Sequence, residues 1–222
     1  MQPDVLLRGS LTYLQHSRQF QRDAAGLYDR DSLSSAVVLS TISLEHIATA
    51  RWLYELLDQP DQVAGLTPRA LKRSLKSDHA STIRKGLKTS PLILHSERVL
   101  ELVSKMTSTD ADSDERKSLN AAIGQLLREE TIAFPRHAHR MREEAQYVAF
   151  DVQTNTWERN ELSNKRARFA VETAARNYVS MIHIFGRDHH AMTLIGRLGI
   201  AADFFDLSRI WPRTPYSKTE NS

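Results

Sequence analysis

Apolar residues recur along this chain at intervals of three and four positions, the spacing that places them on one face of a helix. The pattern is clearest in residues 160–185, where an apolar stripe runs through Ala170, Ala174, Tyr178, Met181 and Phe185. Similar stripes predict further helices over about 4–28, 32–58, 67–88, 91–106, 114–147 and 189–206. No segment alternates between apolar and polar residues as a half-buried strand does. The pattern therefore predicts an all-α protein.

Capping residues and helix breakers predict where these helices begin and end. Asp31 and Thr67 are N-cap candidates, because their side-chain oxygens can accept hydrogen bonds from the free N–H groups of a first turn. Pro68 fits the first position of the third helix. Gly186 is expected to end the long helix and Asp188 to cap the last one. Stretches without periodicity are predicted to be loops: 59–65, 107–113 and 148–158.

The order of the predicted helices indicates one domain. The first two helices are joined by a short turn, so we expect them to form an antiparallel hairpin. Neither side of the 107–113 loop is self-sufficient, and 222 residues are enough to bury a real core. We therefore expect residues 1–210 to form a single antiparallel helical bundle with additional helices, followed by a polar tail over 211–222.

The composition limits the cellular location and the kinds of partner, but it does not indicate a function. The net charge of +3 permits a nucleic-acid partner but does not require one. The chain has no cysteine, which excludes disulfides and thiolate metal sites and fits a reducing cytosol. The N-terminus lacks the pattern of a signal peptide, and no apolar run approaches the roughly 20 residues that cross a bilayer. We expect a cytoplasmic protein with no membrane partner.

The segment from Thr67 to Lys88 is the most basic window, with seven basic residues and one acid. Such a run fits a solvated helix face, and it also fits an electrostatic footprint for a phosphate backbone. On the second interpretation the candidate RNA-binding residues are Lys72, Arg73, Lys76, Arg84 and Lys85.

Two side chains on the long helix carry the strongest candidate chemistry. Arg176 and His183 are seven positions apart, so they point to one side, away from the apolar stripe, about 10 Å apart along the axis. Arginine binds phosphate oxygens, and histidine can move protons near neutral pH. Together they supply what metal-independent cleavage of RNA needs, although a surface or structural role fits the same spacing. Asn177 could orient Arg176, and a two-fold dimer would supply a second Arg–His pair.

Other side chains offer no competing chemistry. His137 and His139 are two positions apart and diverge on a helix, as do the adjacent His189 and His190. The chain has no phosphate-binding loop, dinucleotide fingerprint or serine-nucleophile elbow. We therefore expect neither a metal nor a cofactor.

Four stretches of this chain resemble the AbiV family of abortive-infection proteins, within the HEPN superfamily of helical domains. They are DAAGLYDRDSLSSAVVLSTISLEHIATA, LKSDHASTIRKGL, HRMREEAQYVAFD and the segment from Trp157 into the long helix. HEPN nucleases carry an arginine, a polar residue, and a histidine after four to six intervening residues. Arg176, Asn177 and His183 match that pattern, with six residues between the arginine and the histidine.

The resemblance implies a homodimeric, metal-independent endoribonuclease toxin of antiviral defence, acting in abortive infection. His183 would be the acid/base and Arg176 would bind the scissile phosphate, with Asn177 in support. An antitoxin or a phage-encoded trigger would be a further partner. The family's acidic motif is commonly a double Glu followed by Lys, whereas here His46 follows Glu45, which is the candidate to orient Arg176 or His183. The alternative is a non-catalytic HEPN-like module that binds a partner protein or a nucleotide, as a regulator or antitoxin.

Overall fold

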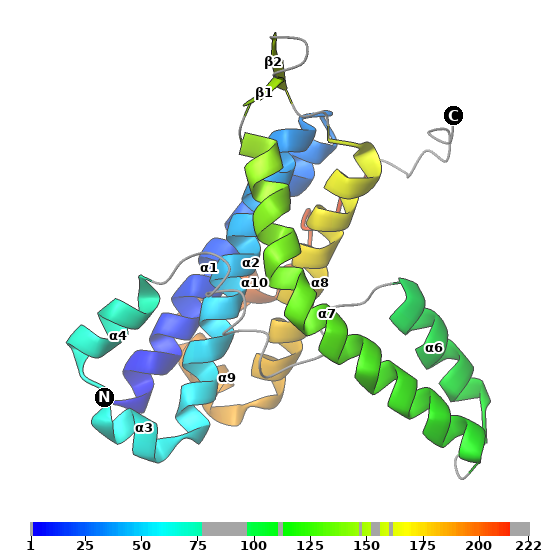
Figure 1. The fold of residues 1–222 in the computed structure, drawn as a ribbon. Coiled ribbons are helices and arrows are strands. Elements are labelled where there is room, and N and C mark those ends of the chain that lie inside the picture. The colour runs from blue at the N-terminus through cyan, green and yellow to red at the C-terminus, as the bar shows by residue number, and fades with distance from the viewer. Residues whose placement is uncertain are drawn as a thin grey trace.

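The computed structural model describes residues 2–76, 97–110, 113–146, 148–151, 156–159 and 162–213. Within these ranges, the side chains of 97–100, 127–137, 148–151 and 156–159 are not described. The described chain is mostly helical, with one short two-stranded ribbon (Figure 1). The prediction of a helical protein is therefore confirmed.

An antiparallel hairpin of α1 (Pro3–Tyr28) and α2 (Leu33–Glu55) forms the centre of the bundle, as predicted (Figure 1). Small side chains let the two helices approach closely. The Ser10 hydroxyl donates to the Ala50 carbonyl at 2.5 Å, and the Ser43 hydroxyl donates to the Ser17 carbonyl at 2.9 Å. Asp31 is not the N-cap of α2, because it lies in the turn with φ of 61° and the helix begins after Ser32.

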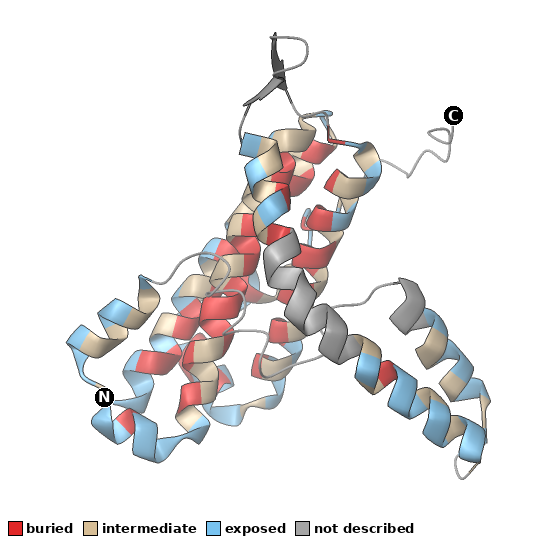
Figure 2. Ribbon diagram, in the orientation of Figure 1, coloured by how far each residue is buried: buried red, intermediate tan, exposed pale blue. Residues whose placement is uncertain are grey.

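The third helix of the bundle is α8 (Asn164–Arg187), which packs against both helices of the hairpin. The stripe predicted from the sequence faces the core, and Tyr178, Met181 and Phe185 are fully buried (Figure 2). They meet Leu7 of α1 and Ile47 of α2 in one apolar cluster. The Tyr178 hydroxyl donates to the Phe204 carbonyl at 2.9 Å, which ties the C-terminal segment to this core.

Helix α7 (Asp114–Gln146) crosses the bundle at one end and leaves it at the other. At the crossing, its buried Met141 packs with residues of α1, α2 and α8 in a second apolar cluster. Its other end pairs with α6 (Glu97–Ser108), and this second hairpin projects away from the bundle (Figure 1). The loop predicted over 107–113 is therefore shorter than expected, because α6 continues to Ser108.

The segment after α2 is more helical than its prolines and glycine suggested. A 3-10 turn (Leu56–Asp58) leads into α3 (Pro60–Gly65), so the predicted 59–65 loop is wrong. Pro60 occupies the first turn, where a helix does not need the missing N–H. Helix α4 (Pro68–Leu75) begins as predicted, with the Thr67 hydroxyl accepting from the Ala70 N–H at 3.1 Å. It ends earlier than the predicted 88.

The predicted loop over 148–158 is also wrong, because it contains the ribbon. Strand β1 (Val148–Asp151) pairs antiparallel with β2 (Thr156–Arg159), with Val148 opposite Arg159 and Asp151 opposite Thr156. Strands of four residues are too short to show a clear alternation of apolar and polar positions. The aromatic and β-branched residues of VAFD and TWER, which favour strands, were the feature of the sequence that could have indicated the ribbon.

At the C-terminal helices one cap prediction is confirmed, one is wrong, and the predicted final helix is divided. The Asp188 carboxylate accepts from the N–H groups of His190 and Ala191, so α9 (His189–Arg197) begins as predicted. Gly186 does not end α8, which continues to Arg187. The predicted 189–206 helix is divided, because Gly199 adopts a φ of 65° before α10 (Ala201–Phe205).

Residues Leu33–Asp58 form a helix long and apolar enough to cross a membrane by length and composition. The expectation that no segment approaches this length is therefore corrected. This segment is α2 with its 3-10 turn, and it packs against α1, α7 and α8. Its central place in the bundle accounts for its apolar composition, because a helix surrounded by other helices is apolar over most of its surface.

Candidate functional site

The outer face of α8, turned away from the apolar stripe, carries both principal candidates. His183 is exposed, and the side chain of Arg176 is 35% exposed. Both lie on the side that α1 and α2 leave uncovered. The arrangement leaves one imidazole and one guanidinium accessible to solvent and to a second molecule.

A carboxylate on the same face holds Arg176. The Arg176 Nη2 lies 3.2 Å from one oxygen of Glu172, and the Arg168 Nε lies 2.7 Å from the other. Glu172 therefore bridges two arginines, one turn away on either side. It directs Arg176 toward the N-terminus of α8, so a bound phosphate would compete with Glu172 for this guanidinium. The sequence interpretation missed Glu172, although its four-residue spacing from each arginine was readable.

Asn177 lies on the buried side of α8. Its side-chain amide donates to the Thr173 carbonyl at 2.7 Å, one turn earlier in the same helix. Such a bond satisfies a polar group inside the bundle. The structure therefore separates Asn177 from the exposed pair, although the three residues are close in sequence.

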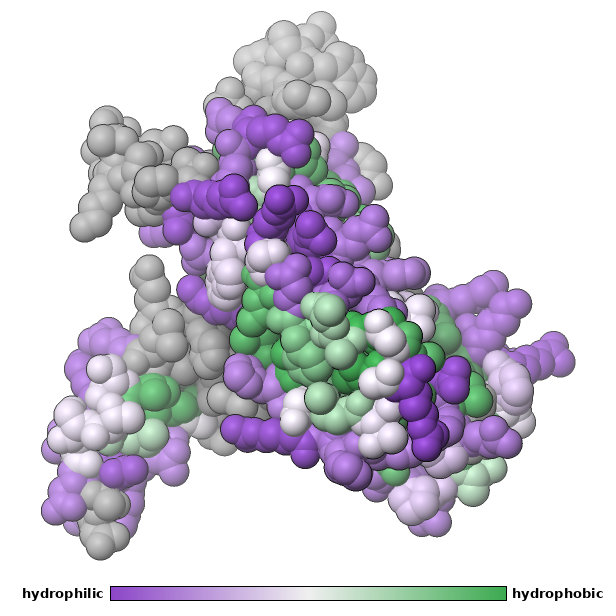
Figure 3. Space-filling model, turned by 180° about the vertical axis from the view of Figure 1, so that it is seen from behind, coloured by the Kyte–Doolittle hydropathy of each residue, from purple (hydrophilic) through white to green (hydrophobic). Residues whose placement is uncertain are grey.

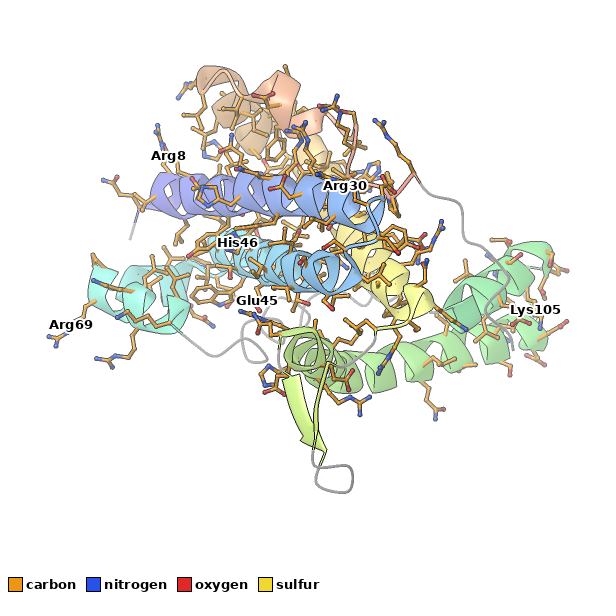
Figure 4. The ribbon with its side chains drawn as sticks, turned by 90° about the horizontal axis from the view of Figure 1, so that it is seen from above. Arg8, Arg30, Glu45, His46, Arg69 and Lys105 are labelled. Carbon is orange, nitrogen blue, oxygen red and sulfur yellow. The ribbon has the colours of Figure 1, made fainter. Side chains whose placement is uncertain are left out.

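Glu45 connects two helices near the crossing of α2 and α7. Its carboxylate oxygen lies 2.8 Å from Nη1 of Arg142, with the two side chains 12% and 15% exposed. Figure 4 shows Glu45 on the side of α2 that faces α7. An ion pair this enclosed fixes how two helices meet, because separating the partners leaves a poorly solvated charge. The geometry gives Glu45 a structural partner in Arg142.

Breaking the Glu45–Arg142 pair should show a coupling between the two residues. We expect Glu45→Ala and Arg142→Ala each to lower the free energy of unfolding by about 2 kcal/mol, with a coupling energy of about 1–3 kcal/mol in the double variant. Urea unfolding of the wild type, the two single variants and the double variant measures this coupling energy. The exposed pair Glu101–Lys105, at 2.8 Å, is a matched control expected to give about 0.5 kcal/mol or less. Equal coupling energies in both pairs would contradict a stabilising role.

His46, the neighbour of Glu45, faces the other way and packs against α1 (Figure 4). Its ring contacts Tyr13 and Phe20 edge to face, with centroids 5.3 and 5.2 Å away, and it lies 5.9 Å from the ring of His16. Burial, and then the charge of His16, lower the pKa of His46 to about 4. His46 is therefore neutral at pH 7 and acts as a packing residue of the hairpin rather than as a proton donor.

The basic window is described only in part. Lys72, Arg73 and Lys76 are exposed on α4 and its C-terminal end, and none has an ion-pair partner among the residues that the structure describes. The candidates Arg84 and Lys85 lie outside the described residues. Helix α4 is well separated from α8 in both Figure 1 and Figure 4. One protomer therefore does not bring the α4 cations together with Arg176 and His183.

Metal ligands do not gather anywhere in the described part of the chain. No group of three or more His, Cys, Asp or Glu side chains there is placed to hold a metal ion. The arrangement on α8 thus offers one cation for a phosphate and one imidazole for proton transfer.

Comparisons with protein-family models, curated proteins and solved structures give no significant match to this chain. The resemblance to the AbiV family and the HEPN superfamily therefore stays a prediction from the four sequence stretches and the Arg–Asn–His pattern.

Proposed function

We propose that this protein is a homodimeric, metal-independent endoribonuclease, an RNA-cleaving toxin of the abortive-infection type. The observation that carries the proposal is the exposure of His183 on the same uncovered face of α8 as Arg176. A buried histidine could not reach a substrate, whereas this face is accessible to RNA and to a second subunit.

The chemistry needs two proton transfers and one cation. The 2′ hydroxyl of RNA attacks the neighbouring phosphorus while one imidazole takes its proton. The bond from phosphorus to the 5′ oxygen breaks, and a second imidazole protonates that oxygen. The products are a 2′,3′-cyclic phosphate and a 5′ hydroxyl. Arg176 binds a non-bridging oxygen and stabilises the charge that develops in the transition state. One His183 from each protomer supplies the base and the acid.

The α8 face also supports the dimer that this chemistry requires. Phe169 is 39% exposed, and Val179 and Ile184 are half-buried. A two-fold axis would place the same face of α8 on both subunits in contact, so that the exposed parts of these side chains make reciprocal contacts across the interface. The Arg–His pairs would then approach each other between the two helices.

The cations of α4 would act at a distance from the scissile bond. Lys72, Arg73 and Lys76 are exposed and can neutralise phosphates by releasing their counterions. Because α4 is remote from α8, they would hold flanking RNA and contribute affinity rather than rate.

Cleavage of labelled RNA by the purified protein in EDTA tests the proposal. We expect 2′,3′-cyclic phosphate ends, and a specific activity that falls on dilution as the dimer dissociates. The proposal would be overturned if the RNA stays intact or if EDTA abolishes cleavage. It would also be overturned if the protein is a monomer whose specific activity does not change on dilution.

A non-catalytic module that binds a nucleotide or a partner protein is the second candidate. A cleft lined with arginines on another side of the bundle favours the nucleotide-binding form of this alternative.

A further inference from the structure

A cleft of about 690 Å³ lies between α1 and the C-terminal segment that follows α9. Figure 4 shows the C-terminal segment beside α1 near Arg30, on the side of the bundle away from α7, which is the side that Figure 3 views. Five arginines and three aspartates line it, together with the exposed ring of Trp211. The five arginines are Arg18, Arg22, Arg30, Arg209 and Arg213.

Only part of this positive charge is used within the protein. The Arg18 guanidinium binds the carboxylate of Asp206 at 2.6 Å and its carbonyl at 2.8 Å. The Arg30 Nε donates to the Gly26 carbonyl of its own helix at 2.9 Å. In the described ranges, the guanidinium groups of Arg22, Arg209 and Arg213 make no hydrogen bond or ion pair, although the charge of Arg22 is among the causes that lower the pKa of Asp206. Like charges that share one cleft repel, and a bound anion removes that repulsion. The hydrogen-bonding capacity of the three groups is therefore available to a ligand.

The turn that carries Arg209 is held in a strained backbone conformation. Arg209 has a φ of 63°, which costs a residue with a side chain about 1 kcal/mol or more. Such a residue persists where its neighbours are fixed. On one side, Arg18 binds the carbonyl oxygen and one carboxylate oxygen of Asp206, as described above. On the other, the fully buried Gln21 donates to the Ile210 carbonyl at 2.8 Å. The fold thus positions Arg209 at the cleft before any ligand arrives.

A second contact fixes the far end of the same segment. The Arg213 backbone N–H donates to the Asp29 carboxylate at 2.8 Å, at the C-terminal end of α1. Trp211 lies between this contact and the Arg209 turn, and its ring is exposed at the cleft. An exposed aromatic ring beside several arginines can stack on a nucleobase while the guanidinium groups bind phosphates.

We propose that this cleft binds a nucleotide that carries two or three phosphates. Its volume is in the range of small-molecule sites. Three arginines that form no ion pair, in a cleft whose five arginines outnumber its three aspartates, match the clustered charge of a polyphosphate, whereas an RNA strand spreads one charge per nucleotide along its backbone. The site goes beyond the RNA-cleaving function and does not depend on it, because the cleft is built from α1 and the C-terminal segment and not from the face that carries His183.

Titration calorimetry of the full-length protein with ATP, GTP, inorganic tripolyphosphate and an eight-nucleotide single-stranded RNA tests the proposal. We expect ATP or GTP to bind more tightly than tripolyphosphate or the RNA, and to quench tryptophan fluorescence in the wild type but not in Trp211→Phe. Arg22→Gln and Arg209→Gln should each weaken nucleotide binding by about tenfold or more. Arg8→Gln is the matched control, because Arg8 is exposed on α1 away from the cleft (Figure 4).

A further variant separates binding from folding. Arg209→Gly removes the guanidinium and relieves the positive φ, because glycine adopts this conformation without strain. We expect it to lose nucleotide binding while its thermal midpoint stays the same or rises. Absence of nucleotide binding up to millimolar concentration, or equal affinity in Arg209→Gly and the wild type, would overturn the proposal. Tripolyphosphate or RNA that binds as tightly as the nucleotides would equally overturn it. None of these results would bear on RNA cleavage by α8.

Discussion

Replacing His183 by alanine is expected to lower the rate of RNA cleavage by about 10²- to 10⁴-fold, the range that a general acid or base contributes. In the proposed dimer one substitution removes both the base and the acid, because each subunit supplies one imidazole. Single-turnover cleavage of labelled RNA in EDTA measures the effect. His189→Ala is the matched control, because His189 is also exposed and lies just after the same helix. We expect this control to stay within about twofold of the wild-type rate.

The loss of rate should come without a loss of stability. His183 is exposed, so its truncation removes little packing, and we expect a change of about 0.5 kcal/mol or less in the free energy of unfolding. Expression in a bacterial host gives a second measurement, since the wild type should arrest growth and His183→Ala should not. Equal growth arrest and equal RNA decay from both proteins would eliminate His183 as a catalytic residue.

The sequence was most informative where structure depends on local chemistry. The apolar stripe of α8 recurs at helical spacing from Ala170 to Phe185, so its buried face could be read from spacing alone. Thr67 and Asp188 cap their helices as predicted, because capping is a contact between residues close in sequence. The same reasoning failed at Gly186, since a glycine with open space around it can also continue a helix.

Contacts between distant parts of the chain could not be read in this way. The Glu45–Arg142 pair joins residues 97 positions apart, and nothing in their neighbourhoods indicates it. In the arginine cleft, Arg18 and Arg22 are four positions apart on one face of α1, which was a readable signal. The other wall of the cleft could not be predicted from the sequence, because it depends on how the 206–213 segment folds back onto α1.

The same limit applies to the face of α8 that carries the proposed chemistry. The seven-residue spacing of Arg176 and His183 placed them on one side, and the four-residue spacing of Glu172 and Arg176 made their ion pair readable as well, but neither spacing shows which helices leave that face uncovered. What keeps that face oriented is the opposite side of the helix, whose large side chains are locked in the core. The orientation of the site therefore depends on the buried residues of α8.

Replacing Phe185 by alanine is expected to lower the free energy of unfolding by about 3–5 kcal/mol, the range for a large aromatic residue removed from a packed core. Its side chain is 0% exposed. The ring packs edge to face on Phe204 of α10 at 5.8 Å and lies 4.9 Å from Tyr54 of α2. Its loss would leave a cavity where α2, α8 and the C-terminal segment meet. Urea unfolding followed by circular dichroism gives the change.

Phe169→Ala is the matched control for this substitution, because Phe169 is the same residue type in the same helix and is 39% exposed. We expect it to cost about 1 kcal/mol or less, since a substantial part of this residue already meets water and its truncation leaves no enclosed cavity. Equal losses in the two variants would mean that α8 does not face the core as described. A large loss for Phe185→Ala alone would establish that the buried stripe holds α8 in place, and with it the outward direction of Arg176 and His183.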